Sequence, residues 1–231
     1  MAHGPDTEEL LRRIRECDGK RLDVSELNIT SIPSLPSTLE ILYCDHTNIT
    51  ELPPLPDTLT FLRCSYTNIT KLPPLPHTLK TLCCLNTNIT ELPPLPDTLN
   101  LLICGYTNIT KLPPLPDTLN ALYCSYTNIT ELPPLPDTLE TLCCLNTNIT
   151  ELPPLPDTLK RLVISNNPLI LQRNEGEPIQ AYNARWEEWR KKKRIQERCR
   201  AVRDGLIAAA LHPKRIERLI DEHGIEVLDV M

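Results

Sequence analysis

The 231-residue sequence has no long apolar run. A membrane-spanning helix needs about eighteen or more consecutive apolar residues, and no segment of the chain provides them without charges. The first residues, MAHGPDTEELLRRIRE, also lack the apolar stretch of a secretory signal peptide. These absences predict an intracellular protein that is not secreted and has no membrane partner.

Net positive charge and paired metal-ligand motifs are absent as well. The formal net charge is −6, which argues against a protein that mainly coats nucleic acid. The ten cysteines include no C-x-x-C pair of the kind that holds zinc. We therefore expect no metal site and no cofactor.

Aromatic residues are scarce: there is one phenylalanine against 24 prolines. Without a pattern, such a composition is typical of disordered chains. Here the prolines are patterned, because NIT-x-LPPLP-x-TL recurs every twenty residues from Asn48 to Leu159. A short fixed period predicts a solenoid in which each turn stacks on its neighbours.

Each turn has apolar residues at offsets 1, 4, 6 and 11 and a small polar residue at offset 9, as from Leu39 to Ile49. This spacing resembles the leucine-rich repeat, L-x-x-L-x-L-x-x-N-x-L. The resemblance implies an α/β repeat fold over residues 21–171. It would be a right-handed solenoid of about eight turns, with a parallel β-sheet on its concave side.

The remainder of each turn, as in LPPLP from Leu52 to Pro56, is similar to the very short L-x-x-L-P-x-L-P repeats of bacterial secreted effectors. Proline cannot continue a helix, so we expect an extended, polyproline-like convex side. We also expect helical caps over residues 1–20, where Asp6 and Glu9 have capping-box spacing, and 172–231, where a helix begins near Pro178. A further short helix is predicted over residues 213–220.

Alternation along a strand predicts which side chains enter the core. Leu42 and Cys44 should point inward, whereas Asp45 should point out, and Cys83 should be accessible. We expect the hydroxyl group of Thr47, and of its equivalents, to bond the backbones of neighbouring turns. Six cysteines share a position that is isoleucine in the last turn, so they should be core residues with reduced thiols: Cys44, Cys64, Cys84, Cys104, Cys124 and Cys144.

The concave columns vary between otherwise copied turns. They are apolar and rich in tyrosine, which is typical of a surface that binds a protein. Inert β-forming residues, or a face covered by a second copy of the chain, are the alternatives. The predicted contacts are Ile41, Tyr43, Phe61, Arg63, Tyr66, Leu101, Ile103, Tyr106, Tyr123 and Tyr126.

The tail carries a basic run: Arg190, Lys191, Lys192, Lys193 and Arg194. Such a run is usually a solvated helix face, but it also allows nuclear targeting or nucleic-acid binding. The stretch from Glu197 to Arg218 resembles tails of proteins of giant amoebal DNA viruses. That resemblance implies a viral origin more than a role. For such a protein we expect a host or viral protein as partner and a location in the host cytoplasm, with nucleus and virion as alternatives.

Enzymatic activity is the weakest alternative. Some effectors with similar repeats carry a carboxyl-terminal ubiquitin ligase with a catalytic cysteine. The candidate nucleophile in this tail is Cys199, which lies on the apolar stripe of the expected helix. The tail is too short for a helical ligase domain, so we predict a non-enzymatic interaction scaffold with no catalytic residues.

Overall fold

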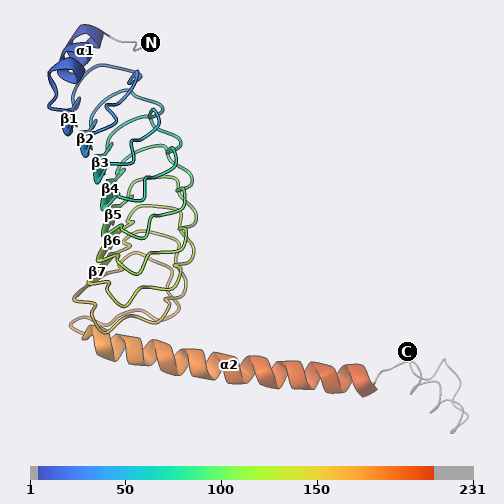
Figure 1. Cartoon of the computed structure of the whole chain (residues 1–231). Helices are drawn as coiled ribbons and strands as arrows, with labels where there is room; N and C mark the ends of the chain where they lie inside the picture. The colour runs from blue at the N-terminus through green and yellow to red at the C-terminus, as the bar shows by residue number, and fades with distance from the viewer. Residues whose placement is uncertain (1–4, 211–231) are drawn as a thin grey trace, which may run out of the picture. The chain divides into compact units, whose positions relative to one another are not determined.

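The computed structural model describes the backbone of residues 5–210 and the side chains of residues 5–202. The predicted helix over residues 213–220 lies outside the described residues. Within them, eight short strands form one parallel sheet in sequence order (Figure 1). The strands are β1 (Arg21–Asp23), β2 (Ile41–Tyr43), β3 (Phe61–Arg63), β4 (Thr81–Cys83), β5 (Leu101–Ile103), β6 (Ala121–Tyr123), β7 (Thr141–Cys143) and β8 (Arg161–Val163).

The twenty-residue period sets the register of the sheet. Every residue of a strand pairs with the residue twenty positions later, as Leu22 pairs with Leu42 and Leu42 pairs with Leu62. The same register continues to the pair of Leu142 with Leu162. The central leucine of each strand is buried. An unbroken period therefore gives a continuous leucine core.

The connections between β1 and β8, all of which the structure describes, contain no helix. Their prolines lack the N–H group that helical hydrogen bonding requires. A tight turn closes each one, as where the Leu59 N–H donates to the Pro56 carbonyl at 3.0 Å. The strands follow the inner side of the arc and the connections follow its outer side (Figure 1). The predicted fold class is confirmed.

The column of six core cysteines lies directly behind the sheet. Each of these side chains has zero exposed surface, and all are free thiols, as the isoleucine at the equivalent position predicted. Burial raises the pKa of every thiol in the column, to about 12 for Cys84 and Cys144. Cysteine therefore serves here as a small apolar residue.

The hydroxyl groups of Thr47 and its equivalents do not bond the backbone of neighbouring turns, so that prediction was wrong. The Thr47 hydroxyl donates to the Cys44 carbonyl of its own turn at 2.9 Å, and the equivalent threonines do the same. A short hydroxyl reaches the backbone three residues earlier, and only Thr147 among these threonines also bonds the next turn, where its hydroxyl donates to the Asn167 side-chain oxygen at 2.6 Å. Asn167 is longer: it donates to Cys144 of the preceding turn at 2.7 Å and accepts from Thr147 N at 2.7 Å.

Helix α1 (Thr7–Glu16) contacts β1 and buries Leu10. The predicted capping box is wrong, because Asp6 makes no side-chain cap bond to the helix. Its carboxylate instead accepts from the Asn28 N–H at 2.7 Å, which ties the helix to the first turn of the solenoid. Glu9 pairs with Arg13 at 2.8 Å.

Helix α2 (Ile179–Ala210) begins close to the predicted position. The chain forms two compact units, and the boundary lies inside this helix, between Asn183 and Ala184. Within the first unit, the Tyr182 hydroxyl donates to the Leu171 carbonyl at 2.6 Å, and the Asn183 amide both donates to and accepts from the Leu155 backbone at 3.1 Å. No described helix has the length and apolar character to cross a membrane.

Candidate strand-face site

The outward side chains of the strands form two columns. Ile41, Phe61 and Leu101 belong to the first column, and Ile103 and Tyr123 belong to the second. All five are half-buried, because neighbours in adjacent turns cover their flanks. The structure thus places these predicted contacts on the same face of the sheet, where Thr81 separates Phe61 from Leu101.

Aromatic and charged side chains cluster at the amino-terminal end of this face. The Tyr43 and Phe61 rings lie 5.1 Å apart, measured between centroids. The Arg21 guanidinium lies over the Tyr43 ring at 5.0 Å, within the range of a cation–π contact. Arg63, in the neighbouring strand, is 47% exposed. Sequence reasoning selected Tyr43, Phe61 and Arg63 but missed Arg21.

Asp45 is buried, which corrects the prediction that it points into solvent. Its carboxylate accepts from the Ser65 N–H at 2.8 Å and from Arg63 Nε at 2.9 Å, with 5% of the side chain exposed. Burial raises the pKa of Asp45, while the bond from Ser65 and the charge of Arg63 oppose that shift. The carboxylate therefore fixes the position of Arg63 on the face.

Cys83 is also less accessible than predicted. Its residue exposure is 8%, and burial raises the pKa of its thiol to about 11. In the sheet it lies between the larger residues Arg63 and Ile103. A small side chain between two larger ones is covered even when it points outward. Cys83 is therefore a poor nucleophile in the folded protein.

A column of left-handed residues follows the strands. Tyr66, Tyr106 and Tyr126 have φ angles of 56°, 53° and 57°, and His46 has 53°. The equivalent position is Asn in other turns, such as Asn86 at 53°. Asparagine tolerates this conformation, whereas for most other L-residues it costs about 1–2 kcal/mol. The chain thus holds aromatic residues in an unfavourable backbone conformation.

Stacking and exposure distinguish these aromatic residues. The His46 and Tyr66 rings stack with centroids 4.4 Å apart and planes at 8°, and the Tyr106 and Tyr126 rings stack at 4.3 Å and 16°. The exposed fractions are 42% for Tyr66, 51% for Tyr106 and 39% for Tyr126. Sequence reasoning selected the tyrosines but missed His46 and the conformation. The asparagines at the same position were the signal that could have shown it.

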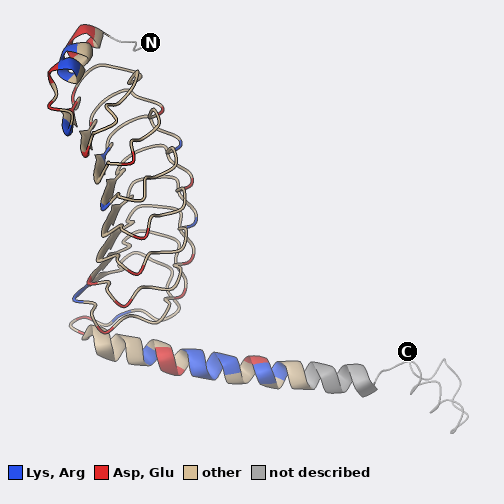
Figure 2. Ribbon diagram, in the orientation of Figure 1, with Lys and Arg blue, Asp and Glu red and all other residues tan. Residues whose placement is uncertain are grey.

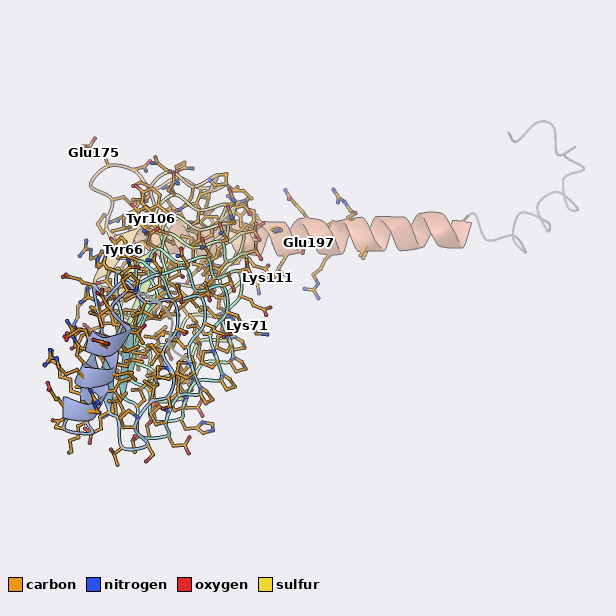
Figure 3. The ribbon with its side chains drawn as sticks, turned by 90° about the horizontal axis from the view of Figure 1, so that it is seen from above. Tyr66, Lys71, Tyr106, Lys111, Glu175 and Glu197 are labelled. Atoms are coloured by element: carbon orange, nitrogen blue, oxygen red, sulfur yellow. The ribbon has the colours of Figure 1, made fainter. Side chains whose placement is uncertain are left out.

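The outer side of the solenoid has a different character. The residue before each LPPLP segment is charged. From Glu51 to Glu131 it is exposed and its sign alternates between turns, through Lys71, Glu91 and Lys111 (Figure 2), whereas the last one, Glu151, is half-buried and repeats the negative sign. Seen down the solenoid, Tyr66 and Tyr106 lie away from Lys71 and Lys111 (Figure 3). These two tyrosines and these two lysines therefore lie on different sides of the solenoid.

The basic run lies on α2 and is partly engaged within the helix. Lys192 pairs with Glu188 at 2.8 Å, and Lys193 lies over the Trp189 ring at 4.8 Å. Arg190 is half-buried, whereas Lys191 and Arg194 are exposed. Cys199 is exposed on the same helix. No group of three His, Cys, Asp or Glu residues that could hold a metal ion occurs in the part of the chain that the structure describes.

Comparison with known proteins gives matches to solved structures. No protein-family model matches the sequence, and no curated protein matches it either. YopM from Yersinia enterocolitica is 38% identical over 60% of this chain, with a TM-score of 0.59. YopM from Yersinia pestis, a leucine-rich effector protein, is 28% identical over 71% of this chain, with a TM-score of 0.62.

A third match covers most of both proteins. The leucine-rich-repeat domain of a Shigella effector is 30% identical over 72% of this chain and 79% of its own length, with a TM-score of 0.64. The chain spans only 31% and 55% of the two YopM chains. The period, the register of the sheet and these matches agree: the chain belongs to the leucine-rich repeat proteins and is similar to the short-repeat proteins of bacterial effectors.

Proposed function

We propose that this protein is a non-enzymatic recognition module that binds another protein on the strand face of its solenoid. The observation that carries the proposal is the set of apolar and aromatic side chains on the strand face, in which Tyr43, Phe61, Ile103 and Tyr123 remain partly exposed after folding. Exposed apolar surface of this kind marks interaction sites. The Yersinia pestis and Shigella structures come from effector proteins with leucine-rich repeats, which supports a protein-interaction module in general.

Rigidity is the mechanism we propose for recognition. The backbone of each turn bonds both neighbours, as where the Cys44 N–H donates to Arg63 and the Asn48 N–H donates to Ile29. Arg63 is held by Asp45, and the tyrosine rings are held by stacking. Groups that are already ordered lose little conformational entropy on binding.

The test compares three full-length variants with the wild-type chain by affinity purification from cell lysate. The first carries Phe61→Glu, Ile103→Glu and Tyr123→Glu on the strand face. The second, a matched control, carries Lys71→Glu and Lys111→Glu on the outer side. The third carries Lys191→Glu and Arg194→Glu on α2. Circular dichroism must first show that each variant is folded.

We expect the strand-face variant alone to lose the bound protein, because charges placed on an apolar contact surface cannot be desolvated cheaply. Retention by the strand-face variant, with loss in the α2 variant, would refute the proposal and assign binding to the basic helix. Steep loss of that binding with salt would indicate nucleic acid. A dimer mass in light scattering that falls to a monomer in the strand-face variant would identify a second copy of the chain as the partner.

A further inference from the structure

Helix α2 carries an apolar stripe that no described residue buries. Every residue from Arg194 to Val202 is exposed, and the exposed fractions are 62% for Ile195 and 63% for Val202. Cys199, which lies between them in the sequence, is exposed as well. Residues separated by four and then by three positions lie on one side of a helix. We call Ile195, Cys199 and Val202 the α2 seam.

Basic residues outnumber acidic ones around the seam. From residue 187 to residue 202 the helix has seven basic and three acidic residues, a net charge of +4 (Figure 2). Because a helix turns by about 100° per residue, Lys191 and Arg198 lie on one flank of the seam. Neither of these two cations forms an ion pair within the described part of the chain. Both are therefore available to a negatively charged partner.

The acidic residues of this stretch do not cancel the positive charge at the seam. Glu188 pairs with Lys192 at 2.8 Å, and Glu187 precedes Ile195 by two turns of helix. Glu197 lies about 200° around the helix from Ile195. A groove that includes Ile195 contains this one carboxylate against three cations, which are Lys191, Arg194 and Arg198.

The spacing of the seam is that of a coiled-coil core. Ile195, Cys199 and Val202 occupy successive d, a and d positions of a heptad, and Leu206 continues the spacing in the sequence. The stripe is narrow, whereas a helix that lies in a membrane surface has a broad apolar face rich in Trp, Phe and Leu. Phosphate groups of a nucleic acid would use the cations but not the apolar side chains. A partner helix uses both.

Charge disfavours a second copy of α2 as that partner. In a parallel coiled coil, a residue at position g faces a residue at position e of the other helix, and these pairs set partner choice. With Cys199 at position a, Arg198 occupies g and Arg203 occupies the facing e position. Two copies would therefore place arginine opposite arginine, whereas an acidic helix would place a carboxylate opposite each of them.

We propose that the α2 seam is a docking site for an acidic amphipathic helix of a partner protein. The partner helix carries apolar residues at positions a and d, which pack against Ile195, Cys199 and Val202. It carries Glu or Asp at the positions that face Lys191 and Arg198. This site is separate from the strand face, so the inference does not rest on the proposed function and each can fail without the other.

The probe is a synthetic peptide of three heptads with leucine at positions a and d and glutamate at positions e and g. At neutral pH its glutamates repel one another, which opposes pairing of the peptide with itself. A second peptide has lysine at e and g. A third has the composition of the first in an order without a heptad repeat. Binding to the full-length chain is measured by calorimetry, and helix formation in the peptide by circular dichroism.

Two variants of the chain separate the apolar from the charged contribution. Ile195→Gln with Val202→Gln removes the apolar stripe and keeps good helix formers, and Lys191→Glu with Arg198→Glu reverses the charge of one flank. All four side chains are exposed, so neither variant removes a packed residue. We expect the wild-type chain and the strand-face variant to bind the acidic peptide equally. Each α2 variant should bind it at least about tenfold more weakly, which corresponds to about 1.4 kcal/mol.

Several results would overturn the inference. Absence of binding, or equal binding by the Ile195→Gln, Val202→Gln variant, would show that the seam is not used. Equal binding of the lysine peptide or of the reordered acidic peptide would remove the case for an acidic helix. Tighter binding of duplex RNA, or of phosphatidylserine vesicles, than of the acidic peptide would assign the basic face of α2 to nucleic acid or to membrane.

The tail of the chain itself is the remaining competitor. Residues 219–231 include four acidic residues and neither Lys nor Arg. The same calorimetry is therefore repeated on a full-length chain with these four carboxylates neutralised. We expect unchanged affinity for the acidic peptide. An increase of tenfold or more would identify the tail as the occupant of the seam and overturn the assignment to a partner protein. The four changes are Asp221→Asn, Glu222→Gln, Glu226→Gln and Asp229→Asn.

Discussion

Alkaline pH should unfold the solenoid through its column of six buried cysteines. Burial raises the pKa of these thiols from the ordinary value of 9.0, to about 12 for Cys84 and Cys144. In the unfolded chain the same thiols ionise near pH 9. A raised pKa in the folded state therefore gives stability that is complete below pH 9 and is lost as the pH rises from 9 towards 12.

The size of the effect follows from the shift. Each thiol ionises in the unfolded chain but stays protonated in the folded one. This difference lowers the free energy of unfolding by about 0.4 kcal/mol per thiol at pH 9 and by about 1.4 kcal/mol at pH 10, because one pKa unit corresponds to about 1.4 kcal/mol. The six thiols together lower the free energy of unfolding by about 2.5 kcal/mol at pH 9 and by about 8 kcal/mol at pH 10. The second figure approaches the whole free energy of unfolding of a typical domain, about 5–15 kcal/mol.

The assay is guanidinium unfolding followed by circular dichroism at pH 7, 8.5, 9 and 9.5, with a phosphine reductant present. The matched control replaces Cys64, Cys104 and Cys124 with valine, since Ile164 shows that a branched apolar residue is accepted at this position. Lysine and tyrosine ionise in both proteins and contribute equally. We expect the valine variant to lose half of the thiol contribution, and an unchanged dependence on pH would refute the reasoning.

Three further predictions concern single sites. Gly105→Ala places a Cβ atom 2.8 Å from the Ser125 carbonyl oxygen, so it should lower the free energy of unfolding by about 1–3 kcal/mol in chemical denaturation; an unaltered midpoint would contradict this packing. Asn167→Thr removes the amide's bonds to Cys144 and Thr147 of the preceding turn and should lower the free energy of unfolding by about 1–3 kcal/mol, whereas a wild-type midpoint would show that Asn167 adds nothing beyond threonine. In timed alkylation at pH 8, read by mass spectrometry, exposed Cys199 should react well before Cys83, and equal rates would contradict the burial of Cys83.

Periodicity made the solenoid predictable. With every turn equal in length, Leu42 can pair with Leu62 without a register shift, and the position shared by cysteine and Ile164 had to be apolar. Predictions from the spacing within one segment were wrong where a residue of another turn offers a competing hydrogen-bond partner. Asp6 has capping-box spacing, but its carboxylate is engaged by the Asn28 N–H, twenty-two residues away. Spacing within one segment carries no information about such a distant donor.

The candidate site was predictable as a list of columns but not as a surface. Alternation correctly separates inward from outward positions, yet it gave no sign that Arg63 and Ile103 cover Cys83, or that Arg63 and Ser65 hold a buried Asp45. Coverage depends on the sizes of neighbours in adjacent turns. For the outward columns, therefore, the sequence predicts the direction in which a side chain points but not how much of it is exposed.

The sequence by itself determined the period, the order and register of the strands, and the residues of the core, because hydrophobic burial must repeat wherever the turn repeats. Only the tertiary structure decided which side chains act together. Stacking brings Tyr106 within 4.3 Å of Tyr126 across twenty residues of chain, and the left-handed backbone turns both rings towards solvent. These interactions depend on the geometry between turns, which no pattern within a single turn specifies.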